Sequence, residues 1–219
     1  MCRIRMLQVI LTPFEKRPPL RAVSADPPPV APLAERLQRL ELDAWAGLYI
    51  EHWRLIRGVL VGHLGYTADL EDVTQQVFET ALKLVSSHKA QLSGDSSGLR
   101  AWLVAIALRL ARAERRRQFK TWFSSEQPEC ENQSTDPLDP ASMQLLQRAH
   151  RVLLLLPAKL RSPWLLRHLE RMSLDEIATS TGVSLATVKR RLLAADQRFQ
   201  KLAQRDPVLR EHLQSGGAT

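Results

Sequence analysis

Apolar residues along most of the chain recur every three or four positions, which is the spacing of one face of an α-helix. Between Leu33 and Leu64 this pattern predicts two helices that meet near Asp43. The buried stripe of these helices is expected to contain Trp45, Leu48, Tyr49, Ile56, Leu60 and Leu64. Gly65 ends the pattern, and Thr67 is placed to cap the helix that follows.

The next helix, expected over Ala68–Val85, has two different faces. Its buried face is predicted to contain Leu70, Val73, Val77, Phe78, Ala81 and Leu82. Its opposite face, here called the acidic face, contains Asp69, Asp72, Gln75, Gln76 and Glu79. A charged stripe of this kind is usually solvated, and the alternative is that it docks on a basic protein partner.

A loop is expected over Ser86–Gly98, followed by a strongly basic helix from about Leu99 to Phe119. Trp102, Ile106 and Leu110 are the residues expected to extend the core. The basic side chains of this helix are Arg100, Arg109, Arg112, Arg115, Arg116, Arg117 and Lys120, and Phe119, Trp122 and Phe123 lie among or after them. Arginines interleaved with aromatic rings suit single-stranded nucleic acid. The alternative is a solvated helix end, where the helix macrodipole favours cations.

Further along, a helix is expected over Ala141–Leu156, and Pro157 leads from it into another. Ser162 and Pro163 suit the cap and the first turn of this second helix. Trp164, Leu165 and Leu169 are expected to pack against the segment that follows.

That segment, Ser173–Phe199, has the pattern of a helix-turn-helix. Ser173 and Glu176 fit a capping box, Gly182 suits the turn, and Ser184 can cap the second helix. The buried stripe of the second helix is predicted to contain Val188, Leu192, Ala195 and Phe199. Thr187, Lys189, Arg190 and Arg191 lie away from that stripe. This arrangement suits a DNA major groove, and the alternative is an ordinary helical hairpin with a solvated basic face.

Composition divides the chain into five parts. Residues 1–32 form a basic, proline-rich extension that is expected to be disordered, and residues 207–219 form a tail. Two helical domains are expected at 33–120 and 141–206, and residues 121–140 form a flexible linker with five acidic side chains and no Lys or Arg. The predicted fold is therefore all-α, with two domains. A net charge of +8 and a pI near 10.1 favour a nucleic-acid partner.

Several classes of function find no support in the sequence. Two cysteines, Cys2 and Cys130, make neither a disulfide framework nor a metal cluster. No apolar run approaches the roughly 20 residues of a membrane span, and no signal-peptide core is present. We therefore expect a cytoplasmic protein without membrane insertion. The sequence also has no glycine-rich phosphate loop and no nucleophile elbow, so we expect no enzyme activity, no metal and no cofactor.

Three stretches together resemble the bacterial sigma-70 family in its short extracytoplasmic-function (ECF) form, which keeps sigma regions 2 and 4. The stretch DLEDVTQQVF and the stretch LRAWLVAIALRLARAERRR resemble region 2. The stretch from LLLLPAKLR to the end of the helix-turn-helix resembles region 4. The similarity covers roughly Ala44–Phe199. It implies a sigma factor that binds core RNA polymerase, recognises the minus-thirty-five and minus-ten promoter elements and directs transcription initiation.

The resemblance also implies roles for particular residues. Asp72, Gln75 and Gln76 match positions that bind the clamp of the polymerase. The residues that match the segment engaging the minus-ten element are Arg100, Arg109, Arg112, Arg115 and Arg116. The residues that match the minus-thirty-five reader are Ser184, Thr187, Lys189, Arg190 and Arg191. Family members are commonly held by an anti-sigma factor, so such a partner is implied as well.

The chain also departs from the family pattern. Arg109 stands where Asn is frequent, and Ala113 stands where Asp is frequent. In region 4, Ala186 replaces a common Gly, and Ala194 replaces a common Arg. Two alternatives therefore stay open at this point. One is a helix-turn-helix regulator with an N-terminal helical sensor domain, and the other is a sigma-derived protein that binds polymerase but does not melt DNA.

Overall fold

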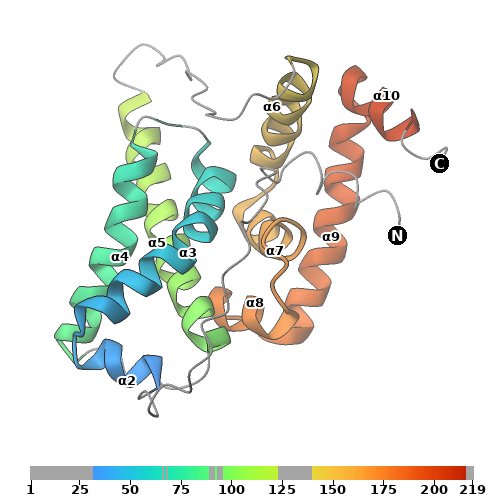
Figure 1. Ribbon diagram of the computed structural model, residues 1–219. Helices are drawn as coiled ribbons and strands as arrows, with labels where there is room; N and C mark the ends of the chain where they lie inside the picture. The colour runs from blue at the N-terminus through green and yellow to red at the C-terminus, as the bar shows by residue number, and fades with distance from the viewer. Residues whose placement is uncertain are drawn as a thin grey trace, which may run out of the picture.

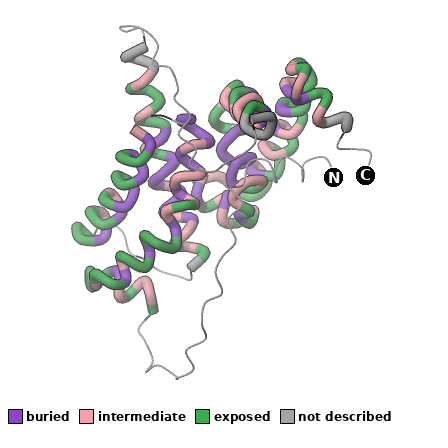
Figure 2. Tube along the Cα trace, turned by 45° about the horizontal axis from the view of Figure 1, so that its top comes forward, coloured by how far each residue is buried: buried purple, intermediate pink, exposed green. Residues whose placement is uncertain are grey.

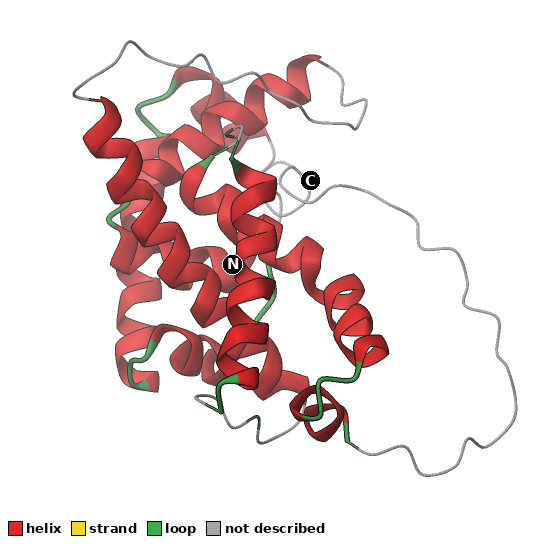
Figure 3. Cartoon of the chain, turned by 90° about the vertical axis from the view of Figure 1, so that its left-hand side faces the viewer, coloured by secondary structure: helices red, strands yellow, loops and turns green. Residues whose placement is uncertain are grey.

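The computed structural model describes residues 32–65, 67, 69–88, 92, 96–122 and 140–215. Within these ranges the chain forms nine helices and no strand, which confirms the predicted all-α class, and Figure 3 shows short loops joining several of them. The helices are α2 (Leu33–Gln38), α3 (Leu42–Leu64), α4 (Leu70–Ser86), α5 (Ser96–Trp122), α6 (Pro140–Leu154), α7 (Ala158–His168), α8 (Leu174–Thr181), α9 (Leu185–Ala203) and α10 (Pro207–Ser215). The extension up to residue 31, residues 89–91 and 93–95 of the expected loop, and the linker over 123–139 lie outside the described residues.

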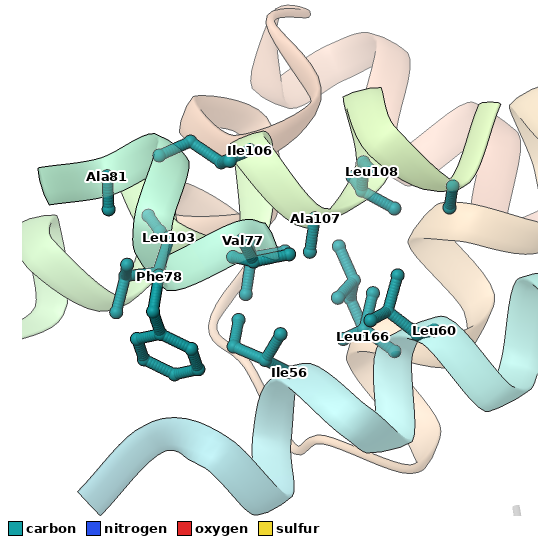
Figure 4. Close-up of a cluster of buried hydrophobic side chains, with 14 of the residues drawn as sticks. Ile56, Leu60, Val77, Phe78, Ala81, Leu103, Ile106, Ala107, Leu108 and Leu166 are labelled. Carbon is teal, nitrogen blue, oxygen red and sulfur yellow. The ribbon is translucent and has the colours of Figure 1, made fainter. Parts of the chain in front are cut away.

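The first half of the fold, α2–α5, is built around α5 (Figure 1). Helices α3, α4 and α8 all pack against α5, so its apolar residues between Leu99 and Ala111 are buried on more than one side. Figure 4 shows how the side chains meet: Ile56 and Leu60 come from α3, Val77 from α4, and Leu103 from α5. The surface of the protein is formed by the outward faces of the helices (Figure 2).

The second half, α6–α10, has its own apolar cluster around Trp164 of α7. The indole ring stacks on Phe199 of α9 with 4.9 Å between ring centroids. Leu145 and Leu153 of α6 and Leu209 of α10 belong to the same cluster. The predicted packing of α7 against the helix-turn-helix is therefore confirmed.

The two halves also share apolar contacts. Leu166 of α7, Met172, Ile177 of α8 and Val188 of α9 belong to the same buried cluster as the residues of α3, α4 and α5. In Figure 4, Leu166 lies close to Leu60 of α3. The fold is thus all-α with two helical groups in contact, while the exact domain limits stay a prediction.

Two residues expected in the core are exposed instead. Tyr49 of α3 keeps 44% of its surface accessible, and Leu82 of α4 keeps 42%. The Tyr49 ring still meets Phe78 of α4 edge-on, with 4.8 Å between ring centroids. Thr74 takes a buried place in α4, because its Oγ1 satisfies its hydrogen-bonding capacity by donating to the Leu70 carbonyl at 2.8 Å.

Two expected helix starts are also wrong. Helix α4 begins at Leu70 after Asp69, without a side-chain cap, and Thr67 contributes only its carbonyl, which accepts from the Leu70 N–H at 3.1 Å. Helix α7 begins directly after Pro157, whose carbonyl accepts two backbone N–H groups, so Pro163 lies inside the helix. Ser162 donates to the Ala158 carbonyl at 2.9 Å rather than capping.

The segment expected to be a tail contains the helix α10. Asp206 caps it, because its Oδ1 accepts the backbone N–H groups of Val208 and Leu209 at 3.0 and 3.1 Å. Pro207 suits the first helical position, and Leu209 is buried in the second cluster. The Asp-Pro pair was therefore a helix-start signal that the sequence analysis took for the end of the fold.

Candidate protein and nucleic-acid interfaces

The acidic face of α4 is open to solvent. Asp72, Gln75, Gln76 and Glu79 are all exposed, and they lie within two turns of the helix. Gln75 donates from Nε2 to Glu79 Oε1 at 2.9 Å, so these side chains interact along the helix. The opposite side of α4 is held in the core by Val73, Val77 and Ala81. The three residues predicted to bind a protein partner thus share one accessible and rigidly mounted surface.

The basic helix α5 presents most of its predicted contact residues at its C-terminal half. Arg109, Arg112 and Arg116 are exposed, and their spacing places them on one face. Arg115 is also exposed, but its Nη1 donates to the His63 carbonyl of α3 at 3.2 Å.

Arg100, the first of the predicted basic residues, lies elsewhere. Its side chain is 28% exposed and points to the second half of the fold. Its Nη2 donates to the Glu170 carbonyl, and its Nη1 lies 3.6 Å from Oε1 of Glu176. The structure therefore does not bring Arg100 together with Arg109, Arg112 and Arg116, and Arg100 joins two helical groups in this arrangement.

The helix-turn-helix has the local geometry that its sequence predicts. The Glu176 N–H donates to Ser173 Oγ at 3.2 Å, and the Ser173 N–H donates to Glu176 Oε2 at 2.7 Å, which completes the capping box. Gly182 adopts a left-handed conformation with φ of 67° between α8 and α9. Ser184 caps α9 by accepting the Thr187 N–H at 3.3 Å.

The candidate reading residues lie at the start of α9. Ser184, Lys189 and Arg190 are exposed, whereas Thr187 and Arg191 are partly buried. The Thr187 hydroxyl lies 3.0 Å from Ser184 Oγ and so belongs to the cap. The exposed apolar side chain of Leu193 lies one turn beyond Lys189 and Arg190, at 62% exposure.

Asp196, which the sequence analysis missed, fixes α9 against α7. Its Oδ1 accepts the Trp164 indole N–H at 2.8 Å and lies 3.4 Å from Nε2 of His168. Its sequence signal was weak, because Asp196 begins the polar run Asp196, Gln197 and Arg198, which looks solvated in the sequence. This bond joins α9 to α7 in addition to their apolar packing.

One arginine and one histidine are buried where α3, α5, α6 and α7 meet. Arg161 of α7 is 1% exposed and donates from Nη1 to the Leu154 carbonyl at 3.1 Å. Burial, with a smaller contribution from Arg115, lowers the pKa of Arg161 to about 10. Burial, with contributions from Arg161 and two further arginines, lowers the pKa of His63 to about 3. His63 is therefore neutral at physiological pH.

The described part of the chain offers neither a metal site nor a membrane span. There, no group of three or more His, Cys, Asp or Glu side chains is arranged to hold a metal ion. Within the same ranges, none of the helices is both long enough and apolar enough to span a bilayer.

Two family models match the chain. The model described as Sigma-70 region 2 matches residues 48–121, which contain α4 and most of α3 and α5. The model described as Sigma-70, region 4 matches residues 146–195, which contain α7, α8 and the first part of α9. Together the two matches cover more than half of the chain, in the order that the sequence analysis predicts.

Similar proteins agree with these matches. The RNA polymerase sigma-H factor of Pseudomonas aeruginosa is 28% identical over 190 residues, which is 82% of this chain and 95% of that protein. The sigma factor RpoE from Bartonella quintana, solved with the anti-sigma factor NepR, superposes with a TM-score of 0.59 at 20% identity, over 75% of this chain and 99% of that one. CnrH, solved with the cytosolic domain of CnrY, gives a TM-score of 0.59 at 21% identity, over 80% of this chain and 96% of that one.

Proposed function

Because the chain belongs to the sigma-70 family, in its ECF form, and directs transcription initiation, we propose specific roles for its exposed surfaces. The acidic face of α4, through Asp72, Gln75 and Gln76, binds the clamp of core RNA polymerase. The exposed arginines of α5, Arg109, Arg112 and Arg116, contact the minus-ten element, and the start of α9 contacts the minus-thirty-five element. The chain acts in the cytoplasm and has no catalytic activity of its own.

The single observation that best supports these roles is the pairing of two exposed surfaces of opposite character in one chain. The acidic face is mounted on α4, and the basic residues are mounted on α5 and on the capped start of α9. Lys and Arg contacts to phosphate provide affinity for DNA, and a few contacts to base edges provide sequence choice. An acidic face beside such surfaces suits a basic protein rather than DNA.

We also propose an anti-sigma factor as a partner. The similar protein RpoE was solved with the anti-sigma factor NepR, and it superposes over nearly its whole length. A partner of this kind would hold the protein away from polymerase until a signal releases it.

Reconstitution with core RNA polymerase tests the proposed function. We expect the chain to bind core polymerase and to direct transcripts from a subset of genomic fragments. We expect the isolated chain to bind promoter DNA poorly at physiological salt, because polymerase positions its two DNA-binding surfaces. Tight, sequence-specific binding by the isolated chain would support a conventional helix-turn-helix regulator. Binding to polymerase without any transcript would support a sigma-derived protein that does not melt DNA.

Replacing Arg190 and replacing Lys189 with alanine are expected to change promoter binding in different ways. Arg190 lies on the same face as Thr187, and an arginine can contact guanine with two hydrogen bonds worth about 1–3 kcal/mol of discrimination. Lys189 lies about 100° around the helix and is expected to contact phosphate. Arg190→Ala should therefore relax sequence choice at one or two base pairs, whereas Lys189→Ala should weaken all promoters about equally.

The measurement is the affinity of the polymerase-bound complexes for a panel of minus-thirty-five variants at several salt concentrations. Lys189→Ala should also reduce the salt slope by about 1. Identical specificity profiles and identical slopes for the two variants would contradict the proposed orientation of α9 in the groove.

A further inference from the structure

A notch in α3, formed by Gly58 and Gly62, receives side chains from the second half of the fold. These glycines lie one helical turn apart and so share one face. A Cβ atom built on Gly62 would lie 2.6 and 2.8 Å from the two methyl carbons of Leu165, and one built on Gly58 would lie 2.6 Å from Oε1 of Glu170. Any larger residue at position 62 therefore collides with α7. This glycine notch is a fitted contact between the two halves.

Three further contacts hold the second half against the first. Arg100 of α5 reaches the Glu170 carbonyl and Glu176 of α8, as described above. His150 of α6 lies 2.9 Å from the Val61 carbonyl of α3 through its Nε2. Apolar residues of α7, α8 and α9 enter the cluster built by α3, α4 and α5. Helices α6, α7 and α8 are thus all bound to the first half.

One part of the same junction opposes these contacts. Arg161 of α7 is buried close enough to Arg115 of α5 and to His63 of α3 to affect the pKa values of Arg161 and His63. Arg161 is buried with its Nη1 bonded to the Leu154 carbonyl and its Nε without a hydrogen-bond partner among the described residues, and burying such a charge costs free energy. The two halves are therefore complementary in shape, but the buried Arg161 makes the free energy of their contact less favourable. This suits a contact that has to open.

The closed arrangement does not allow the two promoter elements to be contacted at the same time. The minus-thirty-five and minus-ten elements lie about 25 base pairs apart, which is about 85 Å of B-form DNA at about 3.4 Å per base pair. Helices α5 and α9 both pack on α8, and packed helices lie about 8–10 Å apart, so α5 and α9 approach within about 20 Å. Residues 123–139, between α5 and α6, can span at most about 60 Å when fully extended. This length allows the two halves to move apart once their contact opens.

We propose that the glycine notch of α3, filled by Leu165 and Glu170, holds the free protein in a closed, self-inhibited state. In this state Arg100 is kept away from DNA. Core polymerase then binds productively only after α7 leaves the notch. The inhibitory consequence rests on the proposed function, whereas closure itself is a property of the free chain and is measured without polymerase.

Alanine substitutions in α3 test the notch, and this helix supplies a matched control. Gly62→Ala collides with the fully buried Leu165, which cannot move without α7, so we expect the closed-to-open ratio to fall by at least tenfold. Gly58→Ala meets only the flexible end of Glu170, so a smaller effect is expected. Gly47→Ala is the control, because its Cβ would have no neighbour within 4 Å.

The readout is the radius of gyration of the free full-length chain in small-angle X-ray scattering, with helical content followed by circular dichroism. Gly62→Ala should increase the radius of gyration at unchanged helical content, whereas Gly47→Ala should leave the radius unchanged. Adding Glu170→Ala to Gly58→Ala should reverse the effect of Gly58→Ala, because it removes the colliding atoms. An unchanged radius for Gly62→Ala, or equal expansion in the control, would overturn the proposal. If Gly62→Ala lowers helical content, the proposal is tested instead by comparing Gly58→Ala with the double variant Gly58→Ala, Glu170→Ala. Equal radii for these two variants would then overturn it.

The affinity for core polymerase separates closure from its consequence. If closure inhibits, Gly62→Ala should tighten polymerase binding by the same factor by which it raises the open fraction. If Gly62→Ala expands the chain without changing its affinity for core polymerase, self-inhibition is refuted. The role of the notch in closing the free chain would still be supported. Failure of every variant to bind polymerase would count against the proposed function, while the scattering result would still stand.

Glu170 provides a second, independent test through pH. In the closed state its carboxyl lies against Gly58 of α3 and faces Arg100 of α5, which also pairs with Glu176 of α8. Burial raises the pKa of Glu170 from 4.5 to about 7, against the opposing effect of Arg100. Burial also lowers the pKa of His52 of α3 below its usual 6.5, so the Glu170→Gln variant is needed to distinguish the two groups.

A raised pKa means that the closed state binds the proton more tightly, so closure is favoured at low pH and is weakened as pH rises through about 7. Between pH 6 and pH 8 we expect the closed-to-open ratio to fall about tenfold. Glu170→Gln, which cannot ionise, should remove this dependence while keeping the chain closed. A pH response that persists in Glu170→Gln would assign it to another group and remove Glu170 from the proposal.

Discussion

Replacing Trp164 with alanine is expected to lower the free energy of unfolding by about 3–5 kcal/mol, the usual cost of removing a large buried aromatic side chain. Trp164 is 1% exposed, stacks on Phe199 of α9, and lies at the centre of the second apolar cluster. Its loss also leaves Asp196 without its indole donor. The substitution therefore removes both the packing and the polar bond that join α7 to α9.

Trp164→Phe is the matched variant, because it keeps an aromatic ring beside Phe199 but removes the donor to Asp196. We expect it to cost about 1 kcal/mol, the usual net value of one hydrogen bond, because the Asp196 side chain is partly exposed and still has His168 nearby. Urea denaturation followed by far-ultraviolet circular dichroism measures both values. A loss below about 1 kcal/mol for Trp164→Ala would show that α9 is held by contacts other than this cluster.

Local signals in the sequence predicted the helix-turn-helix accurately. Ser173 with Glu176, Gly182 and Ser184 each have a physical role that depends on near neighbours in the chain, and the structure contains each of these caps and turns. The acidic face of α4 was predictable for the same reason, since residues three and four apart must share a face of a helix. Whether that face binds polymerase stays a prediction.

Features that depend on contacts between distant segments could not be read from periodicity. Helix α5 is buried on several sides because α3, α4 and α8 surround it, so an apolar stripe understates its core. Arg100 looked like the first residue of a basic surface, yet its partners Glu170 and Glu176 are 70 and 76 positions further along the chain. The notch at Gly58 and Gly62 likewise depends on Leu165 and Glu170, which lie far along the chain.

Replacing Asp72 with arginine is expected to weaken binding to core polymerase by more than tenfold, without changing helical content. Asp72 is exposed on α4 and lies on the same accessible surface as Gln75 and Gln76. If that surface meets a basic partner, the substitution replaces an attraction with a repulsion of like charges. The packing of α4 uses the opposite side of the helix, so the change leaves the core intact.

The control and a second variant separate a local interface from a general effect of charge. Glu211→Arg changes the net charge equally at an exposed site on α10 and should leave the affinity within about twofold of the original, because it lies outside the proposed interface. Gln76→Arg adds a cation to the same face outside the first turn of α4, where the helix macrodipole has little influence, and should also weaken binding. Affinities measured by titration of labelled core polymerase check all three variants. Equal losses for Asp72→Arg and Glu211→Arg would point to long-range electrostatics, and an unchanged affinity for Asp72→Arg would remove α4 from the polymerase interface.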